Sequence, residues 1–296
     1  MHIPSEMLST PVCSVSVAVA IAGVVTAAVS LFKRRAAAPS AFKFALVSAV
    51  VFGVQMLNYP IFSGISGHLI GGVFAAAMLG VPAGVLALAL VLTIQTFLFA
   101  DGGVMMLGAN VLNMAVIGAG FGGWLRAKLI QRGLGAHWST GIAAAVSVEL
   151  AVLVLAVQLV ASGQATLPAI SLLVAVHAVL AVVEGFATAL LVNVCAFDGV
   201  RRTAKSGYAV LSGLLIACLA LAPFASAFPD AFEWAMDRFS LLPGAPEFVH
   251  APFADYAVSG VGNEMVSVFL AAIVGVLVVS GLGYVLMLPV REKSRG

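Results

Sequence analysis

The sequence VCSVSVAVAIAGVVTAAVSLF occupies residues 12–32 and holds no charged side chain. A helix rises about 1.5 Å per residue, so this run is long enough to cross a hydrocarbon core of roughly 30 Å. The run follows the opening MHIPSE (residues 1–6), which lacks the basic residues and the cleavage site of a secretory signal. We therefore predict a retained membrane helix, with Met1 as the first residue of the mature chain.

The composition of the whole chain also indicates a membrane protein. Of its 296 residues, 62% are hydrophobic and 9% are charged, and the mean hydropathy is +1.15. An average soluble domain carries roughly 25% charged residues, so this chain has too few to cover a surface in water. This excludes a soluble enzyme, a disordered protein and a nucleic-acid binder. We predict an all-α polytopic membrane protein, because helices satisfy their own backbone hydrogen bonds in lipid.

Further apolar runs predict about nine transmembrane helices. The expected spans are 12–32, 42–59, 69–80, 83–100, 104–124, 140–161, 168–195, 208–226 and 265–289. The third span is short, about 18 Å as a helix. Gly80-Val81-Pro82 separates it from the fourth span, and a single span over 69–100 is the alternative.

Lysine and arginine concentrate in the cytoplasmic loops of membrane proteins, which gives the orientation. With the N-terminus outside, nine crossings leave the stretches 33–41, 125–139, 196–207 and 290–296 in the cytoplasm. These stretches and their flanks hold all of the 14 basic residues except Arg238. We therefore predict an external N-terminus and a cytoplasmic C-terminus.

A long polar stretch divides the chain into two parts. Residues 227–264 are rich in proline and acidic residues and lie between the last two predicted spans, on the external side. We predict a seven-helix body over residues 1–200, a basic cytoplasmic linker over 201–207, and a two-helix hairpin over 208–296 that carries this external loop.

The first two residues have the atoms of a metal chelate. The amine of Met1, the amide nitrogen of His2 and the Nδ1 atom of His2 can close a five-membered and a six-membered ring on one ion. A fourth nitrogen would complete a square, which favours Ni(II) or Cu(II), with Co(II) possible, over Mg²⁺, Ca²⁺ and structural Zn²⁺. His68 is the best candidate, because it lies in the glycine-flanked segment SGISGHLIGG (63–72) on the same predicted side. The alternative is a frayed terminal His2 and an interfacial His68.

Five short patterns occur in order along residues 1 to about 200. They are MHIP (1–4), SGHLIGG (66–72), FLFADGG (97–103), LGANVLNM (107–114) and VEGFATAL (183–190). Together they resemble the CbiM/NikM family, the substrate-capturing membrane components of energy-coupling-factor transporters for cobalt or nickel. The resemblance implies that the amine of Met1, the amide and imidazole of His2, and the imidazole of His68 bind the metal. The family usually has Asp-Gly after this opening, whereas here Ser5-Glu6 follow, so a favoured turn sequence is lost.

The C-terminal hairpin resembles the small accessory component of the same transporters, here fused to the body. PDAFE (229–233) resembles the PDGLE pattern of that component, and PFADY (252–256) matches its PF-x-DY pattern. The resemblance implies a transmembrane coupling subunit and cytoplasmic ATPases as partners, in a bacterial or archaeal plasma membrane. The chain has no phosphate-binding G-x-x-x-x-G-K-[ST] loop. We therefore predict a transport component and not an enzyme, with no resident cofactor and with Ni(II) or Co(II) as the transported ion.

Other polar residues of the sequence have predicted supporting roles. Gln95, Asn110 and Asn113 lie near the outer halves of their spans, where they are expected to orient His68 or the inserted terminus. His250 is interpreted as an ordinary histidine of the external loop.

Two rival functions stay open at this point. The first is a stand-alone, proton-coupled secondary transporter of divalent metals, with Glu149, His177 and Glu184 as a proton relay. The second is an intramembrane metalloenzyme that uses His177 and Glu184. These two residues share one helix face, but they are separated by about 10.5 Å along the axis. We favour the interpretation that His177 and Glu184 are buried and form hydrogen bonds with neighbouring helices. Neither rival function explains a chain that begins Met-His.

Overall fold

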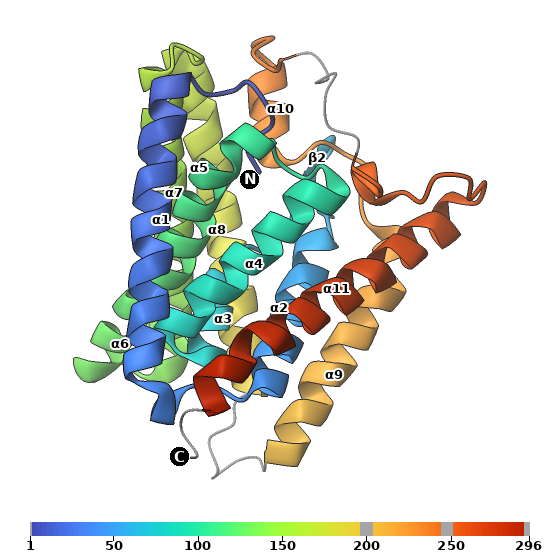
Figure 1. Ribbon diagram of the computed structural model, residues 1–296. Helices are drawn as coiled ribbons and strands as arrows, with labels where there is room; N and C mark the ends of the chain where they lie inside the picture. The colour runs from blue at the N-terminus through green and yellow to red at the C-terminus, as the bar shows by residue number, and fades with distance from the viewer. Residues whose placement is uncertain (1, 196–203, 244–250, 293–296) are drawn as a thin grey trace.

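The computed structural model describes residues 2–195, 204–243 and 251–292, which form a mostly helical bundle (Figure 1). Its principal helices are α1 (Thr10–Lys33), α2 (Ala41–Met56), α3 (Gly72–Leu79), α4 (Val81–Phe99), α7 (Ala136–Ala161), α8 (Leu167–Cys195), α9 (Ala204–Leu221), α10 (Ala231–Asp237) and α11 (Glu264–Glu292). Between the loops that follow α4 and precede α7, one continuous helical run contains η2 (Val104–Met106), α5 (Leu107–Asn110), the π-helical segment η3 (Val111–Phe121) and α6 (Gly122–Gln131). Three further short turns are η1 (Arg35–Ala37), η4 (Ala222–Phe224) and η5 (Ala254–Tyr256).

Seven helical segments of the described chain are long and apolar enough to cross a membrane. Helix α2 is shorter, and α3 is only eight residues long, about 12 Å at 1.5 Å per residue. Gly80 separates α3 from α4, because its φ of +84° ends α3 and Pro82 then begins the next helix. The separation of residues 69–80 from 83–100 is thus observed, while nine crossings and their orientation stay predictions.

The chain is mostly helical, as predicted, and it also contains a small β-hairpin that the sequence did not predict. Strand β1 (Tyr59–Phe62) pairs antiparallel with β2 (Ile65–Gly67), and Gly64 turns between them with a φ of +81°. The physical reason lies in the sequence that follows α2. Pro60 has no N–H with which to continue the helix, and Gly64 supplies the left-handed turn. His68 consequently lies in a loop between β2 and α3, and not inside a helix.

The short helix α3 lies close against η3 because two glycines meet there. A Cβ atom on Gly72 would lie 2.6 Å from the backbone carbon of Gly118. Small residues permit this approach of backbones, which is typical of helices packed in a membrane. The contact fixes the start of α3, and with it the loop that carries His68.

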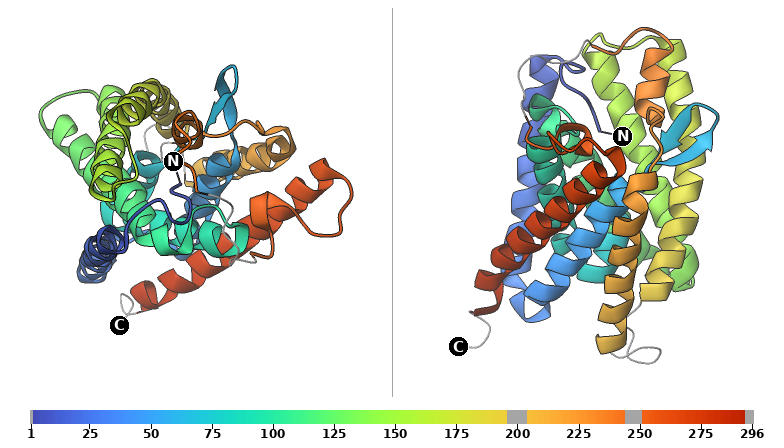
Figure 2. Two further views of the ribbon diagram at one scale, coloured as in Figure 1. Left: turned by 90° about the horizontal axis from the view of Figure 1, so that it is seen from above. Right: turned by 90° about the vertical axis from the view of Figure 1, so that its right-hand side faces the viewer.

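The C-terminal hairpin packs along the body and covers one of its ends. Helix α11 runs beside α2, with Gly275 against the ring of Phe52. The loop before α10 joins the β-hairpin, because the amide of Ser66 donates to the carbonyl of Pro229 over 2.9 Å. The predicted polar loop 227–264 contains α10 and η5. Both lie over the end of the bundle where the N-terminus enters (Figures 1 and 2). Helix α9 begins within the predicted linker, and residues 201–203 lie outside the described part.

Candidate metal centre

The N-terminal arm, residues 2–9, runs from the edge of the bundle to its centre (Figure 2). Ile3 is fully buried, and its backbone is held on both sides. Its amide donates to Oδ1 of Asn110 over 2.9 Å, and its carbonyl accepts from the amide of Gly103 over 2.9 Å. A Cβ atom on Gly103 would lie 2.6 Å from the backbone of Ser5, so the arm needs glycine there. The arm is thus an integral part of the packed structure.

The arm brings His2 next to His68. Their ring centroids are 5.3 Å apart, and the rings are stacked at an interplanar angle of 26°. His2 is 7% exposed, and its Nε2 atom is buried without a hydrogen-bond partner among the described residues. The Nδ1 atom of His68 lies 3.3 Å from the carbonyl of Leu69. The two histidines predicted as ligands therefore lie together, while the third predicted ligand, Met1, lies outside the described residues.

The loop that carries His68 is held by a buried glutamate that the sequence interpretation did not assign to the site. The carboxylate of Glu184, on α8, accepts from the amides of Ile70 and Gly71 over 2.8 and 2.9 Å. On the other side, Nε2 of Gln55 donates to the carbonyl of Ile70 over 2.8 Å. Glu184 thus fixes the backbone two residues after His68. A third hydrogen bond to Glu184 comes from the hydroxyl of Thr188 in its own helix over 3.4 Å. Nδ1 of His177 lies 2.9 Å from the carbonyl of Leu173, also in the same helix.

Replacing Glu184 by glutamine is expected to weaken nickel binding by about tenfold, because an amide N–H₂ would face one of the two backbone donors. The measurement is a nickel titration of the purified full chain. Glu149→Gln is the matched control. It makes the same change on the neighbouring helix α7, where Oε2 of Glu149 is buried without a hydrogen-bond partner in the described chain. Equal affinities of the two variants would contradict a positioning role for Glu184.

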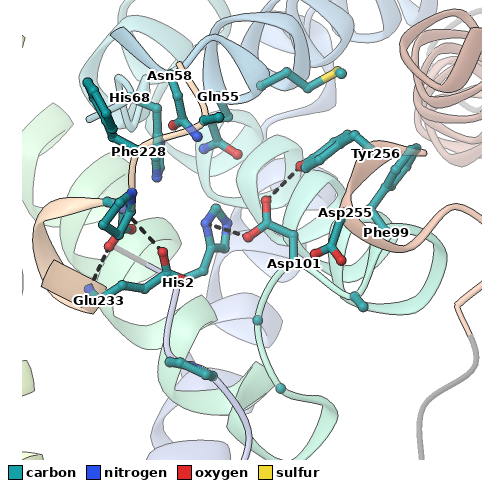
Figure 3. A pocket seen from close by; sticks show the side chains of 18 of the residues that line it. His2, Gln55, Asn58, His68, Phe99, Asp101, Phe228, Glu233, Asp255 and Tyr256 are labelled. Carbon is teal, nitrogen blue, oxygen red and sulfur yellow. Dashed lines mark hydrogen bonds and ion pairs between the residues drawn. The ribbon is translucent and has the colours of Figure 1, made fainter. Parts of the chain in front are cut away.

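A carboxylate beside His2 was also missed. Oδ1 of Asp101 lies 3.1 Å from Nδ1 of His2, and Oδ2 accepts from the hydroxyl of Tyr256 over 2.6 Å. Figure 3 shows Asp101 between these two side chains and joined to both. Asp101 lies within the FLFADGG pattern (97–103), which was the one sequence signal that could have found it.

The predicted supporting residues fall in three places. Asn110 holds the arm at Ile3, as described above. Gln95 donates from Nε2 to the hydroxyl of Tyr256 over 3.3 Å. Asn113 donates to Gln158 of α7 over 2.9 Å and so joins two helices of the body. His250 lies outside the described residues.

The two histidines and four carboxylates line a cavity of about 540 Å³. Burial lowers the pKa of His68 to about 3. Burial also lowers the pKa of His2, although Asp101 acts in the opposite direction. Both imidazoles are therefore neutral at pH 7, the form in which a ring nitrogen can bind a metal. The carboxylates that line the cavity are Asp101, Asp230, Glu233 and Asp255. Neutral nitrogens beside acidic groups suit a divalent cation.

This bundle of membrane-length helices, with its pocket at one end, has the architecture of an integral membrane transport component. Its fold resembles the crystal structure of a truncated transition metal transporter, with a TM-score of 0.55 and 29% identity over 66% of this chain and 97% of the other. The chain belongs to the CbiM family, described as the cobalt uptake substrate-specific transmembrane region, which matches residues 2–201. Residues 205–292 match the PDGLE domain, so a CbiM/NikM-type body is fused to a NikN-like C-terminal part.

Relatives with the same fusion support this assignment. A protein of Archaeoglobus fulgidus named "Putative fused nickel transport protein NikMN" is 31% identical over 97% of this chain and 98% of its own length. The fused nickel transport protein NikMN of Rhodobacter capsulatus is 42% identical over 40% of this chain and 34% of its own length.

Proposed function

We propose that this chain is the metal-capturing membrane component of an ATP-driven uptake transporter of the energy-coupling-factor type, with Ni(II) or Co(II) as its substrate. The observation that carries the proposal is the stacking of His2 on His68 in a buried pocket. These residues are 66 positions apart in the sequence, and the conformation of the N-terminal arm places them next to each other. The names of the fused relatives favour nickel.

In the proposed site, the metal lies in a square of four nitrogens. The amine of Met1, the amide nitrogen of His2 and Nδ1 of His2 supply three of them, and the imidazole of His68 supplies the fourth. The metal displaces the proton of the His2 amide, which leaves to water. Because Nδ1 of His2 contacts Asp101 in the structure, chelation exchanges this contact for a metal–nitrogen bond. A half-turn of the ring about its Cβ–Cγ bond makes that exchange without moving the backbone.

The proposed orientation places the pocket on the external face. The ends of α1 and α11 and the starts of α2 and α9, where the basic residues concentrate, lie at the end of the bundle opposite the pocket (Figure 1). That basic end would face the cytoplasm. There a transmembrane coupling subunit and two ATPases would dock, in the plasma membrane of a bacterium or archaeon. Residues 1–200 would form the capturing body and 208–296 the accessory hairpin.

The proposal is tested by reconstituting the chain in liposomes, with and without its coupling subunit and ATPases. Nickel accumulation that needs the partners and ATP supports it. Accumulation by the chain alone under a pH gradient would favour the proton-coupled secondary transporter. Elemental analysis of the purified chain tests the metalloenzyme alternative, which predicts zinc in place of nickel or cobalt.

Nickel affinity is expected to fall as the pH drops from 7.5 to 5.5, because the proposed chelate releases the proton of the His2 amide and, below the ordinary α-amino pKa of about 7.7–8.0, a proton of the Met1 amine. The pKa values of His2 and His68 are lowered in the pocket, so both rings are already neutral just below pH 6.5 and add little to this dependence. Each proton released on chelation weakens binding by up to about tenfold per pH unit. Titrations at pH 7.5, 6.5 and 5.5 measure this, with circular dichroism as the check on folding. An unchanged affinity at pH 5.5 would contradict the assignment.

A further inference from the structure

The C-terminal hairpin contributes side chains to the pocket that holds His2 and His68. Tyr256 and Asp255, from η5, line it together with Asp230 and Glu233, from α10 and the residue before it. Tyr256 is the member that reaches Asp101 and, through it, the ring of His2. The hairpin therefore touches the proposed ligand through one intervening carboxylate.

The ring of Tyr256 is held by packing contacts that do not depend on its hydroxyl. It stacks on Phe99 with a centroid distance of 4.7 Å and an interplanar angle of 21°. Nearby, the amide of Phe253 donates to the carbonyl of Leu98 over 2.9 Å, which docks the hairpin loop at the end of α4. Removing the hydroxyl alone thus leaves the aromatic packing and this backbone hydrogen bond in place.

The backbone at Tyr256 is held in an uncommon conformation. Asp255 and Tyr256 have φ values of +52° and +57°, a region that bulky side chains rarely adopt. Such strain persists where the surrounding structure imposes it, and it gathers at functional sites. Here it accompanies the placement of the hydroxyl on Asp101.

The hydroxyl can act only as the donor in this contact. Burial, with the charge of Asp101 second, raises the pKa of Tyr256 well above its ordinary value, so its proton stays in place. The donated hydrogen bond fixes Oδ2 of Asp101, which in turn aims Oδ1 at Nδ1 of His2. We propose that Tyr256 is a positioning residue for His2 that acts through Asp101, so that the accessory hairpin completes the metal site.

Asp101 can hold the ring whichever nitrogen binds the metal. In the observed orientation it pairs with Nδ1 and leaves Nε2 on the far side of the ring. A half-turn about Cβ–Cγ moves Nδ1 to that far side and brings Nε2 next to the position that Nδ1 left. The carboxylate then accepts from the remaining ring N–H, as carboxylates commonly do for histidines that bind metals. This inference rests on the proposed function, because it takes His2 as a metal ligand.

The test compares Tyr256→Phe with the intact full chain, using Ni²⁺ alone as the probe. The expected results are about tenfold weaker nickel binding and a shifted ligand-field absorption of the bound ion, which a change in hairpin docking alone would not produce. Tyr284→Phe is the matched control. It removes a hydroxyl from an exposed position of α11 in the same hairpin and is expected to change neither quantity.

The action of Tyr256 on His2 through Asp101 is tested by repeating Tyr256→Phe in an Asp101→Ala background. The tyrosine change is expected to have no further effect there, because the two substitutions interrupt one path. Equal losses in both backgrounds, or an affinity that Tyr256→Phe leaves unchanged or raises, would overturn the inference. His2→Ala in the same assay separates a failure of the proposed function from a failure of the role of Tyr256. If that variant retains nickel, the proposed function fails. If it loses nickel while Tyr256→Phe does not, only the role of Tyr256 fails.

Discussion

Nickel binding by the purified chain is expected to weaken by roughly a hundredfold to a thousandfold when His68 is replaced by alanine. Sites with four protein ligands contribute about 10–16 kcal/mol in small zinc domains, so one ligand is worth about 2.5–4 kcal/mol. His68 is also the proposed ligand that comes from outside the N-terminal arm. Without it, the arm would bind the ion with three nitrogens and would lose the stacking partner of His2.

The measurement is nickel retained after desalting, together with a titration at pH 7.5. His137→Ala is the matched control, because His137 lies at the start of α7, at the end of the bundle opposite the pocket. That variant is expected to bind nickel like the unaltered chain. Full nickel retention by His68→Ala would rule out the proposed square of nitrogens.

Two glycines placed ahead of Met1 are expected to have an effect of similar size, roughly a hundredfold or more in affinity. The added residues turn the amine of Met1 into an amide, and the new amine lies too far along the chain to share one square of nitrogens with Nδ1 of His2. No side chain is altered, so the two histidines and Asp101 remain available. This makes the extension the most direct test of the proposed chelate.

The extension is measured in the same nickel titration, with the absorption spectrum of the bound ion as a second readout. Two glycines added after Gly296 are the control, and they are expected to leave the affinity and the spectrum unchanged. If the N-terminal extension binds nickel as tightly as the unaltered chain, the amine is not a ligand. A site built on His2 and His68 would then have to recruit the neighbouring carboxylates.

The helices of this protein were largely predictable, because hydropathy is a local property. The run at 12–32 predicts a helix that the structure places at Thr10–Lys33, and the break at Gly80 is where α3 meets α4. The β-hairpin at 59–67 was not predicted, because hydropathy alone does not distinguish a short apolar strand from the end of a helix. His68 lies before the start of α3, in agreement with the predicted spans 42–59 and 69–80, which left it outside a helix.

The supporting groups of the site were harder to predict, since they depend on tertiary contacts. Glu184 lies 116 residues from His68, and periodicity on its own helix gives no sign that it faces the amides of Ile70 and Gly71. The same holds for the contact of Tyr256 with Asp101 across 155 residues. Asn110 and Gln95 could be singled out from the sequence, because polar side chains in apolar helices are unusual. Their partners, Ile3 and Tyr256, could not be predicted in the same way.

The turn of the arm contains a residue that departs from the family pattern, and the fold accommodates it. Glu6 stands where the family usually has glycine, and it adopts a φ of +68°. That conformation costs a residue with a Cβ atom about 1–2 kcal/mol. The buried side chains of Ile3, Met7 and Leu8 on either side of the turn offset it. The arm therefore reaches the pocket without the Asp-Gly turn.

The docking of the hairpin over the pocket has a consequence for how such a transporter is assembled. A separate accessory subunit would reach its place by diffusion, and its occupancy would vary with its abundance in the membrane. Here both parts belong to one polypeptide, so encounter is intramolecular, at an effective concentration on the order of millimolar for a short connection. Every copy carries one accessory hairpin for one N-terminal arm, and the ratio of the two is independent of expression level.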